Sequence, residues 1–167
     1  MHMKWLIAGG GTGGHLFPGV ALAEEVLTRH PENEVLFVGT SAGLEARVIP
    51  ELGYRLELID VSGLKGKGLK SRLSGLLKLP RAMWQARALL KREKPQVVVG
   101  VGGYASGPIV FMAALMRIPT AVQEQNALPG FTNKVLGRVV RAVFTAFKEA
   151  GPYFPPKKVH LLGNPIR

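Results

Sequence analysis

Residues 9–15 read Gly-Gly-Gly-Thr-Gly-Gly-His, and they directly follow an apolar run at residues 5–8. Glycines let backbone N–H groups approach a ligand closely, because no Cβ stands in the way. The amphipathic stretch that follows predicts a helix, whose N-terminus offers unsatisfied donors and a partial positive charge. The segment therefore predicts a phosphate site. His15 adds an imidazole, and histidine can serve as a general base near neutral pH.

Gly9, Gly11 and Gly14 also fit the Gly-x-Gly-x-x-Gly pattern of dinucleotide-binding enzymes. That class of site needs an acid at the end of the second strand to bind the ribose. The second expected strand ends without one, and Glu45 falls too late, inside the next expected helix. His15 stands where a Walker loop has its lysine. A dinucleotide oxidoreductase is thus the least favoured function, and a tight turn with a capping histidine is the structural alternative.

Two further loops follow apolar strands. Residues 100–108 read Gly-Val-Gly-Gly-Tyr-Ala-Ser-Gly-Pro, where Ser106 is expected to cap the following helix and Tyr104 either stacks on a sugar or packs. Residues 123–126 are four consecutive polar residues, which bind a ligand or form a buried hydrogen-bonding corner. Because parallel strands end at one edge of a sheet, the three loops are expected to form one site.

The alternation of apolar strands with helical stretches predicts an α/β fold with a doubly wound parallel sheet. The expected strands are residues 4–8, 34–38, 55–60, 96–100, 120–123, 142–145 and 159–162. The expected helices are residues 18–29, 44–52, 69–79, 81–94, 108–116 and 132–140. The length of 167 residues suits one domain.

The net charge of +11 favours an anionic partner: a phosphorylated substrate, a phospholipid or nucleic acid. No RNP, zinc-finger or helix-turn-helix pattern is present, so nucleic acid is not expected as a partner. The chain has no cysteine, which excludes disulfides and thiolate zinc sites. A soluble basic surface without a specific partner is the alternative.

Five motifs occur in order at residues 9–18, 62–68, 102–108, 124–126 and 163–167. With these motifs, essentially the whole chain resembles the N-terminal half of the MurG family of peptidoglycan glycosyltransferases. The resemblance implies a GT-B fold, in which two Rossmann-like domains face a cleft. Residues 1–163 would form the N-terminal domain that receives lipid I, and residues 164–167 would begin the interdomain linker. The C-terminal domain, which supplies most of the UDP-GlcNAc site, is expected to be absent from this chain, either because the chain is truncated or because the enzyme is split.

The reaction that the resemblance implies is the inverting transfer of GlcNAc from UDP-GlcNAc to the MurNAc 4-hydroxyl of lipid I, giving lipid II, with no cofactor. His15 is the first candidate for the general base, and Glu124 is the second candidate or an orienting partner. The expected substrate-binding residues are Thr12, Gly13, Gly14, Gly103, Tyr104, Ser106, Asn126, Asn133 and Arg167. Gln123 replaces the family's histidine, so no imidazole is available there. The chain alone is expected to be inactive. The alternative function is a module that binds a lipid pyrophosphate or a membrane without catalysis.

Residues 64–81 carry six cations and no acid, with leucines at helical spacing. A basic amphipathic helix is typical of the membrane surface, and an ordinary helix that buries its leucines is the alternative. The residues expected at an anionic membrane are Lys65, Lys67, Leu69, Lys70, Arg72, Leu73, Leu76, Leu77 and Lys78. The expected location is peripheral, on the cytoplasmic face of the bacterial cell membrane.

Overall fold

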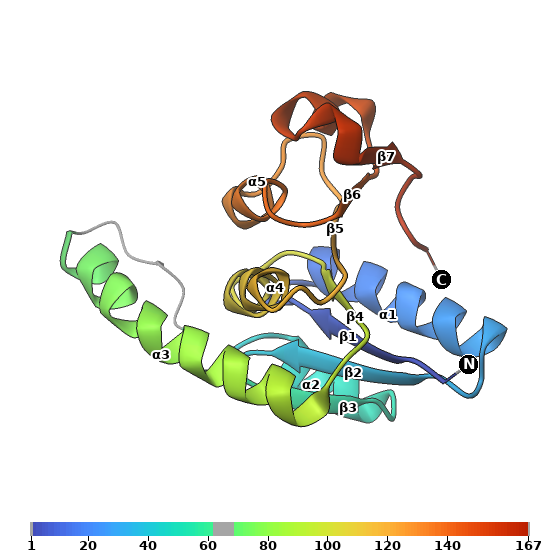
Figure 1. Ribbon diagram of the computed structural model, residues 1–167, viewed down its shortest axis with the longest axis horizontal. Helices are drawn as coiled ribbons and strands as arrows, with labels where there is room; N and C mark the ends of the chain where they lie inside the picture. Colours follow the sequence, from blue (N-terminus) through green and yellow to red (C-terminus); the bar gives the residue numbers. More distant parts are fainter. Residues whose placement is uncertain (1, 62–68, 167) are drawn as a thin grey trace.

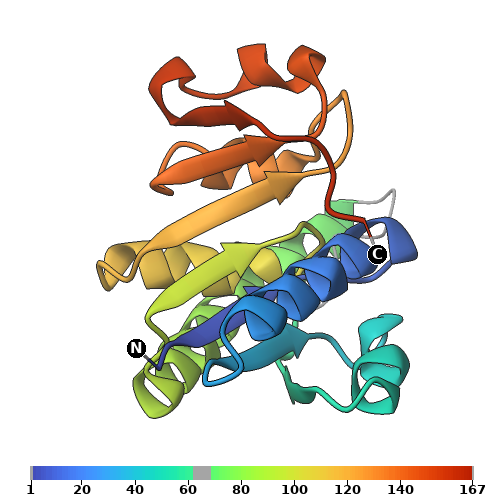
Figure 2. The ribbon, with the colours of Figure 1, turned by 90° about the vertical axis from the view of Figure 1, so that its right-hand side faces the viewer.

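The computed structural model describes the backbone of residues 2–61 and 69–166, and the side chains of residues 2–61 and 79–166. Its centre is a parallel sheet with the strand order β3-β2-β1-β4-β5-β6-β7 (Figures 1 and 2). The strands are β1 (Lys4–Ala8), β2 (Glu34–Gly39), β3 (Arg55–Leu58), β4 (Val97–Gly100), β5 (Thr120–Glu124), β6 (Ala142–Thr145) and β7 (Val159–Leu161). The order reverses between β1 and β4, which confirms the doubly wound, Rossmann-like sheet expected from the sequence.

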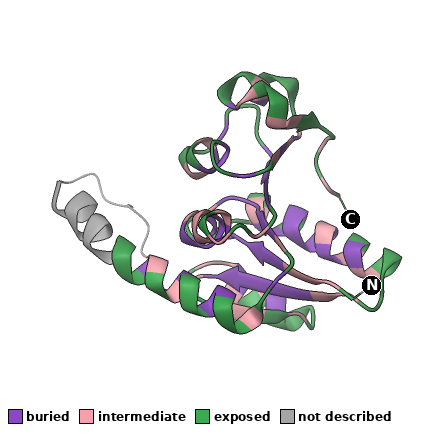
Figure 3. Cartoon of the chain, in the orientation of Figure 1, coloured by how far each residue is buried: buried purple, intermediate pink, exposed green. Residues whose placement is uncertain are grey.

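Helices cover both faces of the sheet (Figure 1). They are α1 (Gly13–Arg29), α2 (Glu45–Glu51), α3 (Leu69–Glu93), α4 (Ser106–Leu115) and α5 (Phe131–Leu136), with 3-10 helices at Lys148–Tyr153 and Pro156–Lys158. Buried residues of α1 and α2 form one hydrophobic cluster with the sheet, and those of α3, α4 and α5 form another on the opposite face. The strands between them are largely buried (Figure 3).

Residue alternation in β1 shows how one strand serves both faces. Leu6 and Ala8 belong to the cluster on the α3–α4 side, whereas Ile7 belongs to the cluster on the α1 side. All three are fully buried. A strand buried on both faces must be apolar throughout, and this is why these strands were recognisable as continuous apolar runs.

Two helices differ clearly from expectation. α1 begins at Gly13, five residues before the expected start at Pro18, so the glycine-rich segment contributes the first helical turn. Residues 69–93 form the single helix α3, with Pro80 inside it, where two helices were expected. Proline removes only one intrahelical N–H, and α3 buries Ala82, Ala86 and Leu90 beyond it. Packing of that apolar face outweighs the local preference for a break.

Charged residues at the amino ends of β1, β2 and β3 form an ion-pair cluster. The Lys4 ammonium lies 3.2 Å from the Glu34 carboxylate and 3.1 Å from that of Glu93, which also receives Arg55 at 3.4 Å. Burial raises the pKa of Glu93, but hydrogen bonds from Arg92 and Lys4 and the nearby positive charges outweigh burial and lower that pKa. These ion pairs lie at the amino edge of the sheet, whereas the glycine loops lie at its carboxyl edge.

Candidate functional site

The three loops singled out in the sequence lie at the carboxyl edge of the sheet, after β1, β4 and β5. β1 pairs with both β2 and β4, so the strand order reverses between the first and second loops. Open α/β sheets bind ligands at this point, because the connections on either side lead to opposite faces. The expected grouping of the loops is therefore found.

Three amides of the first loop are hydrogen-bonded inside the protein. The pairs are Gly9 N with Val38 O (3.0 Å), Gly10 N with Gly102 O (3.2 Å) and Gly11 N with the Glu45 carboxylate (2.7 Å). In the described part of the chain, no acceptor is bonded to the amides of Thr12, Gly13 or Gly14, and the Thr12 side chain does not cap α1. These three amides at the start of α1 are the ones that can receive an anion.

Glycines bring the first and second loops into direct backbone contact. A Cβ added to Gly103 would overlap the carbonyl oxygen of Gly10, and one added to Gly9 would overlap that of Gly102. Gly103 also has φ +83°, a conformation that favours glycine. Gly14 differs, because the nearest atom to an added Cβ is the Thr12 hydroxyl at 3.9 Å. Gly103 thus has a clear packing role, while Gly14 borders open space.

His15 lies where the first two loops meet. Its Nδ1 is 3.2 Å from the Thr12 hydroxyl, and the side chain is half-buried. The imidazole lies over Gly102, where an added Cβ would come within 2.9 Å of Nε2. Gly102 therefore makes room for the ring, and Thr12 orients it.

Two side chains of the second loop differ in access. Tyr104 is 43% exposed and can meet a ligand. Ser106 is fully buried and donates its hydroxyl to the carbonyl of Gly103 at 2.8 Å. The expected capping role of Ser106 is wrong, because α4 begins at this residue and has no side-chain cap. The hydroxyl instead closes the loop on itself.

Glu124 organises the third loop. Its carboxylate is 1% exposed and accepts four hydrogen bonds. The donors are Asn126 N (2.9 Å), Asn126 Nδ2 (3.0 Å), Gly130 N (3.2 Å) and Asn133 Nδ2 (3.0 Å). Asn133 is buried, so it and Glu124 form the hydrogen-bonding corner that was one of the two expectations, whereas Asn126 remains exposed.

Sequence reasoning assigned no contact to two buried glutamines that tie the third loop to its neighbours. Gln125 donates to the carbonyl of Val101 at 3.0 Å, which links the third loop to the second. Gln123 donates to the carbonyl of Gly163 at 3.3 Å. Only the position of these residues at the carboxyl end of a strand hinted at such a role.

Glu45 was dismissed from the sequence as too distant from the second strand. It does lie in α2, but its carboxylate reaches back to the amides of Gly11 and of Thr40, just beyond β2. Those donors and an exposure of 1% leave it unable to bind a ribose. One sequence feature could have indicated that Glu45 is buried. It lies four residues before Ile49, and this spacing places both residues on the same, buried face of α2.

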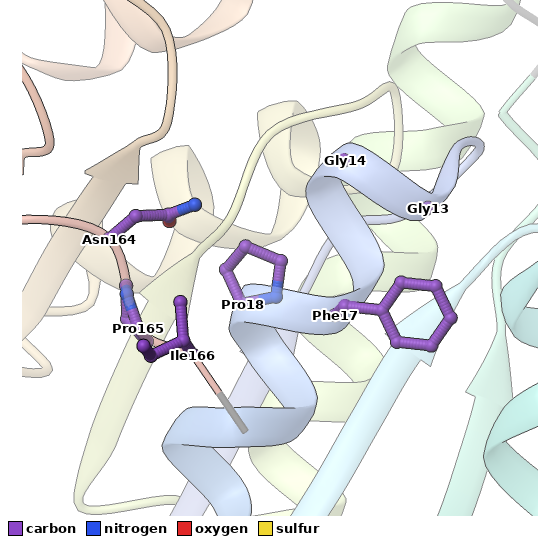
Figure 4. Close-up of a pocket in the computed structure, with 7 residues that line it drawn as sticks. All are labelled: Gly13, Gly14, Phe17, Pro18, Asn164, Pro165 and Ile166. Carbon is purple, nitrogen blue, oxygen red and sulfur yellow. The ribbon is translucent and has the colours of Figure 1, made fainter.

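A groove of about 490 Å³ runs beside the first turn of α1. Its walls come from α1 and from the segment after β7, and they are Gly13, Gly14, Phe17, Pro18, Asn164, Pro165 and Ile166 (Figure 4). The C-terminal segment therefore returns to the glycine-rich end of α1. Arg167, the last expected binding residue, lies outside the described residues.

The expected membrane residues fall largely beyond what the structure describes. Lys65 and Lys67 lie outside the described residues, and the others lie in the first part of α3, where the backbone alone is described. Further along α3, Leu79 and Trp84 are 47% and 71% exposed. In the described part of the chain, no helix combines the length and apolar character that a transmembrane span requires.

Comparison with known proteins gives consistent matches across the chain. The glycosyltransferase family 28 N-terminal domain matches residues 5–145. The UDP-N-acetylglucosamine--N-acetylmuramyl-(pentapeptide) pyrophosphoryl-undecaprenol N-acetylglucosamine transferase of Myxococcus xanthus is 69% identical over 165 residues, which are 99% of this chain and 43% of the relative. The same enzyme of Anaeromyxobacter dehalogenans is 66% identical, with the same coverage. The chain thus spans less than half the length of these relatives.

The crystal structure of MurG from Acinetobacter baumannii superposes with a TM-score of 0.83 at 32% sequence identity. The match covers 99% of this chain and 46% of that one. The fold is therefore that of one half of a GT-B glycosyltransferase, as expected from the sequence.

Proposed function

Because the chain belongs to the glycosyltransferase family 28 N-terminal domains, we propose that it is the acceptor-binding half of a GlcNAc transferase of peptidoglycan synthesis. The complete enzyme moves GlcNAc from UDP-GlcNAc to the MurNAc 4-hydroxyl of lipid I, with inversion, and gives lipid II. The observation that carries the proposal is the placement of His15 beside the amides of Thr12, Gly13 and Gly14, for which the described residues supply no acceptor. Such a site combines a proton acceptor with donors for a pyrophosphate.

We assign residues 1–163 to acceptor binding and residues 164–167 to the start of the linker. A second domain would then supply most contacts to UDP-GlcNAc. The course of residues 164–166 supports this assignment, because they line the groove beside Gly13 and Gly14. A donor held by the second domain would meet the acceptor at this glycine-rich wall.

The transfer is a single displacement. The MurNAc 4-oxygen forms a bond to C1 of GlcNAc while the bond from C1 to the UDP oxygen breaks, and the hydroxyl proton passes to the base. When Nδ1–H of His15 donates to the Thr12 oxygen, Nε2 is left without a proton and can accept the one from the hydroxyl. Amide donors at the start of α1 stabilise a pyrophosphate without any proton transfer.

A transfer assay tests this function and separates it from a binding module. The complete two-domain protein is expected to transfer labelled GlcNAc to lipid I, and the 167-residue chain alone is expected to bind lipid I without turnover. Binding is measured by the shift of a fluorescent lipid I analogue in detergent. Absence of transfer by the complete protein would contradict the enzyme and favour the lipid-binding module; transfer by the 167-residue chain alone would contradict the division of roles.

We further propose that the start of α3 places this domain on the cytoplasmic face of the bacterial membrane. Its cations and the exposed Leu79 and Trp84 support this, since headgroup attraction contributes about 1 kcal/mol per nearby cation. Replacing Lys70, Arg72 and Lys78 together with glutamine is expected to weaken cosedimentation with anionic vesicles at low salt by at least tenfold.

The matched control replaces three exposed cations elsewhere, Arg47, Lys148 and Lys157, with glutamine. The control is expected to sediment with anionic vesicles nearly as the unchanged protein does. Equal loss in both variants would show that only net charge matters. Failure of the unchanged protein to sediment would contradict the membrane proposal altogether.

A further inference from the structure

The buried carboxylate of Glu45 lies directly beneath the first glycine loop. Oε2 accepts the amide of Gly11 at 2.7 Å, and Oε1 accepts the amide and hydroxyl of Thr40 at 2.9 and 3.2 Å. Glu45 is 1% exposed, and in the described part of the chain no basic side chain forms an ion pair with it. The groups that donate hydrogen bonds to Glu45 are the amide of Gly11 in the first loop and the amide and hydroxyl of Thr40.

Three glycines from separate segments make the space for this carboxylate. They are Gly10 in the first loop, Gly39 at the end of β2 and Gly43 before α2, and a Cβ added to any of them would overlap the Glu45 side chain. Burying a carboxylate is costly unless hydrogen bonds compensate for the lost water. The hydrogen bonds from Gly11 and Thr40 provide that compensation.

The bond to Gly11 bears on the proposed site through the next residues. It fixes the last loop amide before Thr12, Gly13 and Gly14, whose own amides have no acceptor in the described part of the chain. His15 follows at once in the first turn of α1. The orientation of the amides and the imidazole therefore depends on where Gly11 is held.

We propose that Glu45 is a positioning residue for the transfer, which anchors the first glycine loop to β2 and α2 so that the free amides and His15 face the acceptor. This inference rests on the proposed function. Glutamine at this position has one oxygen, so its NH₂ group must face the amide of either Gly11 or Thr40, and one of the two anchors is lost. Small displacements of reacting groups reduce rates by large factors.

The experiment compares Glu45→Gln with Ile49→Val in the complete transferase. Ile49 is fully buried one turn along α2 and offers no hydrogen bond to the loop. Both variants are assayed well below their thermal midpoints. Glu45→Gln is expected to lower kcat at least tenfold and to speed hydrogen–deuterium exchange of residues 9–15. Ile49→Val is expected to lower the thermal midpoint and leave kcat and that exchange unchanged.

Wild-type kcat and exchange in a folded Glu45→Gln protein would overturn the inference, as would an equal loss of kcat in Ile49→Val. Should Glu45→Gln not fold, Gly43→Ala displaces the carboxylate without deleting it, and it is expected to give the same changes; unchanged kinetics and exchange there would overturn the inference. If the wild-type protein transfers no GlcNAc, the proposed function fails, and the exchange measurement alone decides whether Glu45 anchors the loop.

Discussion

Replacing His15 with alanine is expected to lower kcat of the complete transferase by about 10²-fold or more, the usual contribution of a general base. The alanine removes the group that takes the proton from the acceptor hydroxyl but keeps the glycine loop, whose anchoring bonds come from backbone amides and Glu45. The KM for lipid I is expected to change little. Steady-state kinetics with lipid I and UDP-GlcNAc measure both constants.

Two further variants identify the proton transfer itself. His15→Gln retains a hydrogen-bonding side chain beside Thr12 but cannot take up a proton, so it is expected to lose as much activity as alanine does. His30→Ala, at the exposed end of α1, serves as the matched control and is expected to retain wild-type activity. Activity of His15→Gln within threefold of wild type would contradict the role as base.

Sequence patterns could predict the strands because most of them are short apolar runs. Residues 4–8 and 142–145 were located to the residue, and the carboxyl edge of the sheet followed from the alternation of strands and helices. The two largest errors in the helices fell at prolines. Pro18 and Pro80 were taken as a helix start and a helix break, but both lie inside helices, where packing onto the sheet compensates for one missing N–H.

The site was predictable in its parts but not in its connections. Glycine patterns indicated the loops, yet nothing local distinguished Gly103, which touches Gly10, from Gly14, which borders open space. Likewise the bond from Gly11 to Glu45 joins residues that are far apart in the sequence. Contacts between separate loops depend on the register of the whole sheet, and this explains why Glu45 was dismissed.

Replacing Glu124 with glutamine is expected to lower the free energy of unfolding by about 1–3 kcal/mol, the cost of burying an NH₂ group that faces donors and has no acceptor. The amide has one acceptor oxygen, whereas the carboxylate serves four donors through two oxygens. The new NH₂ group is expected to turn toward Asn126, because that exposed residue can bond to water while Gly130 and Asn133 keep the oxygen. Chemical denaturation measures the loss.

The same change decides between the two roles left open for Glu124. As an orienting residue it acts through Asn126, so its replacement frees that side chain and lowers kcat/KM by about 10²-fold, the size expected when a substrate contact is misplaced by an ångström. Adding Asn126→Ala to Glu124→Gln should then cost little more, because both changes remove one interaction.

As a general base, Glu124 would act independently of Asn126, and the two losses would multiply. The structure favours orientation, since a carboxylate that is 1% exposed and accepts four hydrogen bonds must give up some of them to receive a proton from the acceptor. His15 needs no such rearrangement, because its single bond to Thr12 leaves Nε2 available. Non-additive losses in the double variant, together with the loss of kcat in both His15 variants, would assign proton transfer to the first loop and substrate orientation to the third.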